Sequence, residues 1–157
     1  MQANFVFSET SPSAGGTAAS SQPVQGGDGR AGIAWPLDDF VSMDVVAELV
    51  GATSDTLDVY LQTSPDEGYT WVDAIHWPQL SAGHAAVVYR NTLSLASTPT
   101  APTVVGEGLS PALAANTVVP GAFGDRARLV MVAGASTSAG AKVVVRLALQ
   151  RPRTNQT

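Results

Sequence analysis

The sequence contains no cysteine, so the chain has no disulfide, thiolate nucleophile or thiolate metal ligand. It is also poor in charge, with 13% charged residues where an ordinary soluble domain has about 25%. Its 8 basic residues are scattered singly among 13 acidic ones, for a formal net charge of -5. This distribution argues against a nucleic-acid partner, and the shortage of charge favours a protein packed among neighbours.

Long apolar runs are missing as well. No stretch approaches the roughly 20 apolar residues of a membrane span, and the first residues lack the basic and apolar parts of a signal peptide. We therefore expect a protein made and kept in a cytosol, with no membrane partner. A length of 157 residues predicts one domain, which buries enough surface to form a stable core without disulfides or bound metals.

Residues 8–32 are dominated by Ser, Thr, Gly, Ala and Pro, and Val24 is the one sizeable apolar residue among them. Such a composition buries too little apolar surface to offset its own ordering entropy. The plain interpretation is a free tail, and the alternative is an arm that another subunit holds. We adopt the arm, placed at residues 1–32, and expect a β domain over residues 33–157.

The β domain is predicted from short apolar runs of period two that turn residues separate, as is typical of a sandwich or barrel. Alternation is clearest over 57–62 and 142–149, and 85–95 and 126–133 are also expected strands. The pattern predicts seven or eight strands.

Two stretches are less regular. Residues 38–50 fit either a strand or a capped amphipathic helix, and their β-branched residues, followed by a turn at 51–55, favour the strand. Four prolines interrupt 96–124, so we expect a long connection there with two short strands in it.

Motifs for cofactor binding and acyl transfer lack their required context. Residues 27–32 fit G-x-G-x-x-G, but no strand precedes them and Pro36 would interrupt the helix that should follow. Residues 108–112 lack the closing glycine of a serine hydrolase elbow and place a proline after the serine. We therefore expect neither a cofactor nor a nucleophile.

The two histidines, His76 and His84, match no zinc-ligand spacing. On a regular strand Asp73 and His76 would point to opposite faces, which removes the simplest His–carboxylate pair, and His84 fits a loop before a strand. The adjacent carboxylates Asp38-Asp39 and Asp66-Glu67 cannot face each other across a cleft as glycosidase acids do. We expect no enzyme, no catalytic residue and no metal site.

One segment carries a specific signal. Residues 64–71 read Ser-Pro-Asp-Glu-Gly-Tyr-Thr-Trp, which matches every position of S-x-D-x-G-x-T-W. Asp66 is expected to bond backbone amides across a turn, Gly68 to supply a positive φ, and Trp71 to cover the hairpin. The matched positions are Ser64, Asp66, Gly68, Thr70 and Trp71. They resemble the Asp-box hairpin of sialidase propellers and many unrelated β proteins, which implies a structural turn away from any active site.

The hairpin around this turn, over 55–77, together with residues 124–150, resembles small virion proteins of tailed bacteriophages. The resemblance implies an antiparallel, jelly-roll-like β-sandwich, whereas the extended N-terminal arm and Glu67, where glycine is common, depart from its pattern. It further implies a non-enzymatic decoration or cement protein that binds the major capsid protein or other virion subunits. The location would be the virion, after assembly in the host bacterial cytoplasm, and the expected oligomer is a trimer or a ring.

Aromatic residues are the candidate assembly contacts, although each also suits ordinary core or loop packing. They are Phe5, Phe7, Trp35, Trp77 and Tyr89. Two alternatives remain open: a neck or tail accessory protein, and a carbohydrate-binding or receptor-binding sandwich whose exposed Trp and Tyr stack on sugars. A coplanar exposed aromatic pair would favour sugar binding, and aromatics at a subunit boundary would favour assembly.

Overall fold

The computed structural model describes residues 2–10, 17–19, 23–25, 35–37, 39–50, 56–81, 85–97, 104–108, 110–133 and 142–152. For residues 2–10, 17–19, 23–25, 35, 133 and 142 it describes the backbone. All regular structure in these stretches is β-strand. In the described part of the chain, no helix has the length and apolar character needed to cross a membrane.

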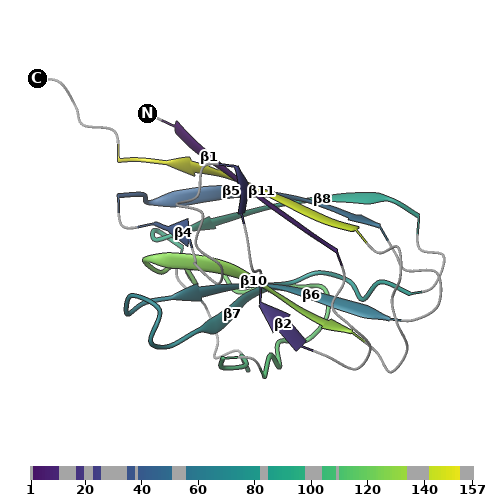
Figure 1. Ribbon diagram of the computed structural model, residues 1–157. Coiled ribbons are helices and arrows are strands. Elements are labelled where there is room, and N and C mark those ends of the chain that lie inside the picture. Colours follow the sequence, from purple (N-terminus) through teal and green to yellow (C-terminus); the bar gives the residue numbers. More distant parts are fainter. Residues whose placement is uncertain are drawn as a thin grey trace, which may run out of the picture.

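Two antiparallel sheets form two layers (Figure 1). Sheet A contains, in spatial order, β3 (Pro23–Gln25), β1 (Gln2–Thr10), β11 (Lys142–Gln150), β5 (Ser42–Val50) and β8 (Val87–Ser94). Sheet B contains β2 (Thr17–Ala19), β10 (Arg126–Ala133), β6 (Leu57–Ser64), β7 (Val72–His76) and β9 (Thr117–Val118), and β4 (Trp35–Pro36) also pairs with β10. The predicted all-β antiparallel sandwich is confirmed at this level.

The main core lies between the two sheets. Along β5, buried and half-buried residues alternate without exception, so one face of the strand is directed inward. The same alternation brings side chains of β6, β10 and β11 into one apolar cluster with those of β5. The strand predicted within 38–50 is therefore confirmed, and the helical alternative is wrong.

The expected N-terminal arm is not confirmed. Residues 2–10 form β1, which pairs with β11 over its full length, from Gln2 opposite Gln150 to Thr10 opposite Lys142. Residues 23–25 pair with β1, and residues 17–19 pair with β10. The composition of 8–32 gave no sign of these pairings, because a strand at a sheet can take its hydrogen bonds and packing from distant parts of the chain. The rest of 1–32 lies outside the described residues.

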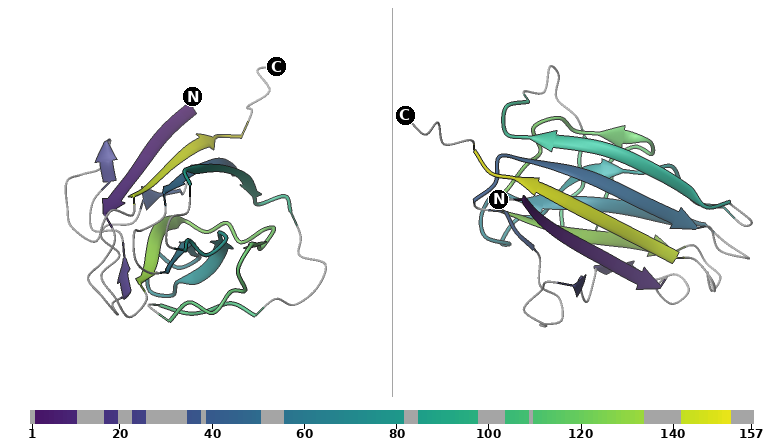
Figure 2. Two further views of the ribbon diagram at one scale, coloured as in Figure 1. Left: turned by 90° about the vertical axis from the view of Figure 1, so that its right-hand side faces the viewer. Right: turned by 90° about the horizontal axis from the view of Figure 1, so that it is seen from above.

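One end of the sandwich collects several connections. The start of β1, the end of β11 and the turn between β6 and β7 all lie there, on the left in Figure 1. The two views in Figure 2 show β8 at the border of sheet A and β1 and β11 side by side. Leu37 N–H donates to Asp125 C=O at this end, and Asp125 N–H donates to Ser64 C=O at 2.7 Å.

Candidate functional site

A β-bulge places polar residues of β7 on the outer face of sheet B. The register between β6 and β7 shifts between Leu61 and Gln62, so that Tyr60 lies opposite His76 while Gln62 lies opposite Asp73. Ala74 and Ile75, which are consecutive, both belong to the main core. The extra residue turns Asp73 and His76 to the same side. The expectation that they point to opposite faces is therefore wrong.

Asp73 fastens the connection between β8 and β9 to this face. Its carboxylate is fully buried, and Oδ2 accepts hydrogen bonds from the backbone N–H groups of Gly106 (2.8 Å), Ala112 (2.9 Å) and Leu113 (3.0 Å). Oδ1 accepts one from Gln62 Nε2 at 2.8 Å. A buried carboxylate with four donors is well satisfied, so its role is to hold the covering segment in place.

His76 binds the same segment and also has a carboxylate partner. Its Nδ1 lies 2.6 Å from Leu113 C=O, its Nε2 lies 3.1 Å from Asp58 Oδ1, and its ring stacks on Tyr60 with centroids 3.9 Å apart. His76 thus has a carboxylate partner, although it is not Asp73. The partner comes from β6, two residues before Tyr60, rather than from β7. Both ring nitrogens face acceptors of the fold, which fixes the orientation of the ring between Leu113 and Asp58.

The surroundings of His76 shift the pKa values of Asp58 and Tyr60. Burial alone would raise the pKa of Asp58, but hydrogen bonds from His76 and Gln79 hold that pKa below its ordinary value. Burial, together with the charges of Asp58 and Asp73, raises the pKa of Tyr60 to about 12. Tyr60 therefore stays neutral at ordinary pH and acts as a packing surface for His76.

Arg128 of β10 links this polar face to the turn at 64–71. Its Nε donates to Gln62 Oε1 at 2.9 Å, and a terminal nitrogen donates to Gly108 C=O at 2.9 Å. The guanidinium also lies 4.3 Å from the centroid of the Trp71 ring, within cation–π range. We refer to Asp58, Gln62, Asp73, His76 and Arg128 as the polar clamp.

The turn at 64–71 has the hydrogen bonds that its sequence pattern calls for. Asp66 Oδ1 accepts from Thr70 N–H at 2.6 Å and from Ser64 Oγ at 2.9 Å. Ser64 Oγ in turn accepts from Gly68 N–H at 2.7 Å. These bonds from Thr70 and Ser64 hold the pKa of Asp66 below its ordinary value. The Trp71 ring is buried and lies against Gly68 of the turn.

Two residues at the tip of this turn have a positive φ. Gly68 has a φ of 97°, which side-chain-bearing residues rarely adopt, and Glu67 has a φ of 59°. Glu67 N–H donates to Asp125 Oδ2 at 2.6 Å, a contact that holds the tip against the start of β10. Tyr69, which follows Gly68, is 89% exposed. Sequence reasoning missed Tyr69 as a surface residue, although its place at the tip of the predicted turn was a usable signal.

The candidate assembly contacts differ in their positions. Trp77 is 2% exposed and donates from Nε1 to Asn91 Oδ1 at 3.1 Å, so it belongs to the core and cannot anchor a neighbour from the surface. Tyr89 is half-buried on β8 and packs against the main core. The backbones of Phe5 and Phe7 lie opposite Leu147 and Val145, and that of Trp35 lies opposite Ala127. His84 lies outside the described residues, as do residues 27–32.

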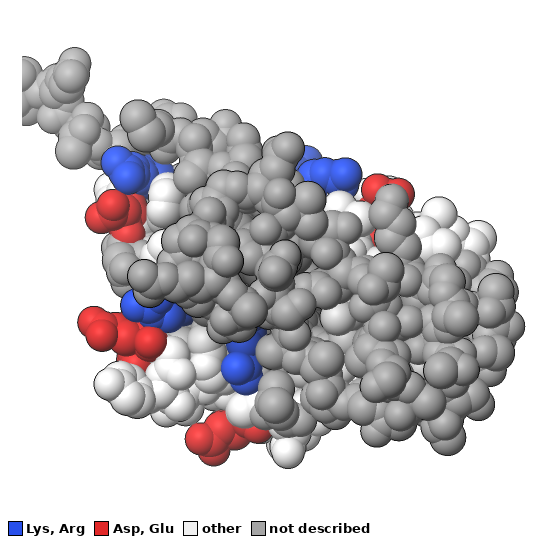
Figure 3. Space-filling view, viewed as in Figure 1, with Lys and Arg blue, Asp and Glu red and all other residues white. Residues whose placement is uncertain are grey.

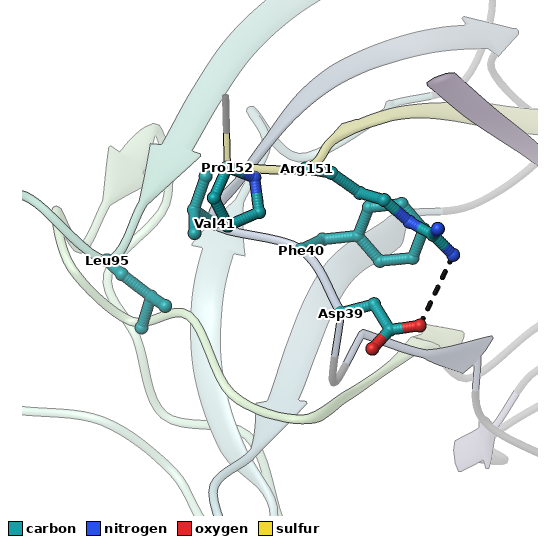
Figure 4. A pocket seen from close by; sticks show the side chains of 6 residues that line it. All are labelled: Asp39, Phe40, Val41, Leu95, Arg151 and Pro152. Atoms are coloured by element: carbon teal, nitrogen blue, oxygen red, sulfur yellow. Dashed lines mark hydrogen bonds and ion pairs between the residues drawn. The ribbon is translucent and has the colours of Figure 1, made fainter. Parts of the chain in front are cut away.

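Two shallow hollows lie at the end of the sandwich. The first is lined by Asp39, Phe40, Val41, Leu95, Arg151 and Pro152. Figure 4 shows Arg151 reaching across the Phe40 ring toward Asp39, with its guanidinium nitrogen 3.2 Å from Asp39 Oδ2, and Leu95 standing apart on the other side. The second hollow shares Phe40 and Leu95 and adds Pro65 and Phe123. Both are mainly apolar, and neither contains the polar clamp.

Surface charge is sparse where it is described. On the face seen in Figure 3, the described Arg, Asp and Glu side chains form small separate groups. Within the described residues, no three His, Cys, Asp or Glu side chains gather as a metal site would require. The side chains of the polar clamp are engaged with one another and with the backbone.

Comparisons with known proteins gave no match among protein-family models, curated proteins or solved structures.

Proposed function

We propose that this chain is a non-enzymatic virion structural protein that binds and stabilises the capsid of a tailed bacteriophage as a decoration or cement protein. The observation that carries the proposal is the order of the strands. Jelly rolls occur in viral capsid proteins and in lectins, where they present loops and faces for adhesion. Fold alone does not assign function, so the surface and the polar clamp must agree with it.

The strand order supports a jelly roll. Eight strands, taken in chain order, are β1, β2, β5, β6, β7, β8, β10 and β11. Sheet A uses the first, eighth, third and sixth of them as neighbours, and sheet B uses the second, seventh, fourth and fifth. This alternation between layers is the order that two interlocked Greek keys produce. The short strands β3, β4 and β9 are additions to it.

The surface and the polar clamp support adhesion rather than catalysis. Tyr69, Leu95 and Val104 are more than half exposed, and only 13% of all residues are charged, so apolar contacts are available for binding other subunits. His76 and Asp73 have their hydrogen-bonding atoms occupied by the fold itself. A neck or tail position in the virion would use the same surface chemistry and is the alternative location.

A sugar-binding module is less well supported. Stacking on a sugar needs a flat pair of exposed aromatic rings, and Tyr69 is the one aromatic side chain among those described that is largely exposed. Trp71 and Trp77 are buried.

The experiment mixes the purified full chain with phage particles that lack it and measures co-sedimentation, followed by imaging of the particles. We expect saturable binding at positions that repeat with the symmetry of the capsid lattice. Density restricted to the neck or tail would favour the alternative location. Absence of binding, together with retention on a glycan array, would overturn the virion proposal in favour of a sugar-binding module.

A further inference from the structure

The sheet edges differ in length. At the borders of sheet B, β2 has 3 residues, β4 has 2 and β9 has 2. In sheet A, β3 has 3 residues, whereas β8 at the opposite border has 8. Short edge strands are one of the means by which proteins prevent their sheets from pairing with other chains. β8 does not use it.

β8 also lacks the other common protections. Its pairing with β5 runs from Leu49 opposite Val87 to Ser42 opposite Ser94 with no register shift, so no bulge bends the edge away. Its sequence contains no proline, and its one charged residue, Arg90, lies 3.3 Å from Asp44 Oδ2 of β5. Among the described residues, no strand or bridge pairs with its outer side. Alternate N–H and C=O groups of the strand therefore point toward an edge with which no described strand pairs.

We infer that the outer edge of β8 pairs antiparallel with β8 of a second copy of this chain, which joins two A sheets into one. Antiparallel pairing of identical strands is self-complementary about a twofold axis, so both edges are satisfied at once. The chain as a whole has a net charge of -5, which repels a second copy, but the Arg90–Asp44 pair leaves this edge locally neutral. Two copies can therefore approach along β8 with little electrostatic cost.

The sequence of β8 restricts the register. An axis through Arg90 would set the two Arg90 side chains directly opposite each other, which is unfavourable. An axis through Tyr89 or Asn91 avoids this. With the axis at Asn91, Arg90 lies opposite Thr92 of the second copy, and both side chains are on the exposed face of β8.

This dimer does not depend on the virion role, since it concerns the purified chain alone. It does differ in symmetry from the trimer or ring that the phage resemblance implies. The two are distinguishable because the dimer is measured without particles.

The first measurement is the mass of the full chain by sedimentation at micromolar concentration. We expect a dimer, and we expect Val88→Lys to weaken its dissociation constant by about tenfold or more, because it places a charge beside the pairing edge. Val88 is 64% exposed and Val104 is 78% exposed, so Val104→Lys is a matched control with the same change away from β8. The control should leave the dimer intact.

A second measurement remains informative if Val88→Lys impairs folding. The chain has no cysteine, so single cysteines at Tyr89, Arg90 or Asn91 report only on their own contacts. We expect rapid disulfide-linked dimers at one of these positions and none for Val104→Cys. A monomer, a trimer, or a dimer that Val88→Lys leaves unchanged and that none of the three cysteines cross-links would overturn the inference.

Discussion

The two faces of sheet B are held by different chemistry. The inner face packs against sheet A through apolar side chains such as Leu61, Leu129 and Met131, all of which are almost fully buried. The outer face carries the polar clamp, and beside it a small second core of Tyr60, Leu113, Val119 and Val130. The inner face is held by buried apolar surface, whereas the outer face is held mainly by a few hydrogen bonds. We therefore expect the first to set global stability and the second to set the order of one covering segment.

Truncation of the inner face should give the largest loss. Leu61 is fully buried in the main core, so Leu61→Ala removes apolar contacts that neighbouring side chains cannot replace. We expect a loss of about 3 kcal/mol in the free energy of unfolding, measured by urea denaturation. Hydrogen exchange should rise across both sheets together. A loss confined to β6 would contradict the view that this core is one cooperative unit.

Removal of Asp73 should distinguish the contribution of the outer face to stability from that of the inner face. Asp73→Ala leaves the N–H groups of Gly106, Ala112 and Leu113 without their acceptor, and we expect a cost of about 2 kcal/mol, because water can replace part of what is lost. The decisive readout is hydrogen exchange, which should increase mainly over 104–113. Asp73→Asn keeps an acceptor oxygen and should fall between the parent and Asp73→Ala. Unchanged exchange in 104–113 would show that the segment is held by its apolar contacts alone.

The turn at 64–71 gives a smaller, local effect. Asp66→Ala removes the acceptor of Thr70 N–H and Ser64 Oγ, so the denaturation midpoint should fall. Glu67→Ala is the matched control, since the Glu67 contact to Asp125 is made by its backbone N–H and survives the change. Equal midpoints for Asp66→Ala and the parent would mean that the turn does not depend on this carboxylate.

Acid should weaken the outer face before the inner face. The pKa of Asp58 in the folded chain lies below its ordinary value of 3.8, so its charged form contributes stability that is fully present above that value. This contribution is lost as the pH falls from 3.8 through the lower folded pKa. Stability measured against pH should therefore fall less steeply in Asp58→Asn than in the parent over that window. If the stability–pH curves of Asp58→Asn and the parent were parallel, the Asp58–His76 contact would not be the source of the acid-dependent loss.

The smallest expected change is an increase in the free energy of unfolding. Glu67 has a φ of 59°, which costs a residue with a side chain about 1 to 2 kcal/mol, part of which glycine returns through its greater freedom in the unfolded chain. Glu67→Gly should thus raise the free energy of unfolding by about 0.5 kcal/mol, as measured by thermal and urea unfolding. A decrease would show that the Glu67 side chain makes a stabilising contact.

Sequence patterns predicted the inner face better than the outer one. Period-two alternation identified β6, β10 and β11 because one side of each strand is apolar, and the 64–71 spacing identified a turn whose bonds are local. The bulge beside Ala74 left no mark in the sequence, so the common side of Asp73 and His76 could not be foreseen. β1 was missed for a related reason: its partner β11 begins more than 130 residues further along the chain.

The place of β11 in sheet A also sets an order of events during synthesis. β11 lies between β1 and β5, so these two strands are joined through the sheet only after residues 142–150 have been made. In a nascent chain, the edges of β1 and β5 that later pair with β11 stay unpaired while most of the domain is already outside the ribosome. Closing such distant pairs is slow, and open edges in the waiting chain can pair wrongly. Folding after synthesis of β11, rather than strand by strand, is the expected behaviour.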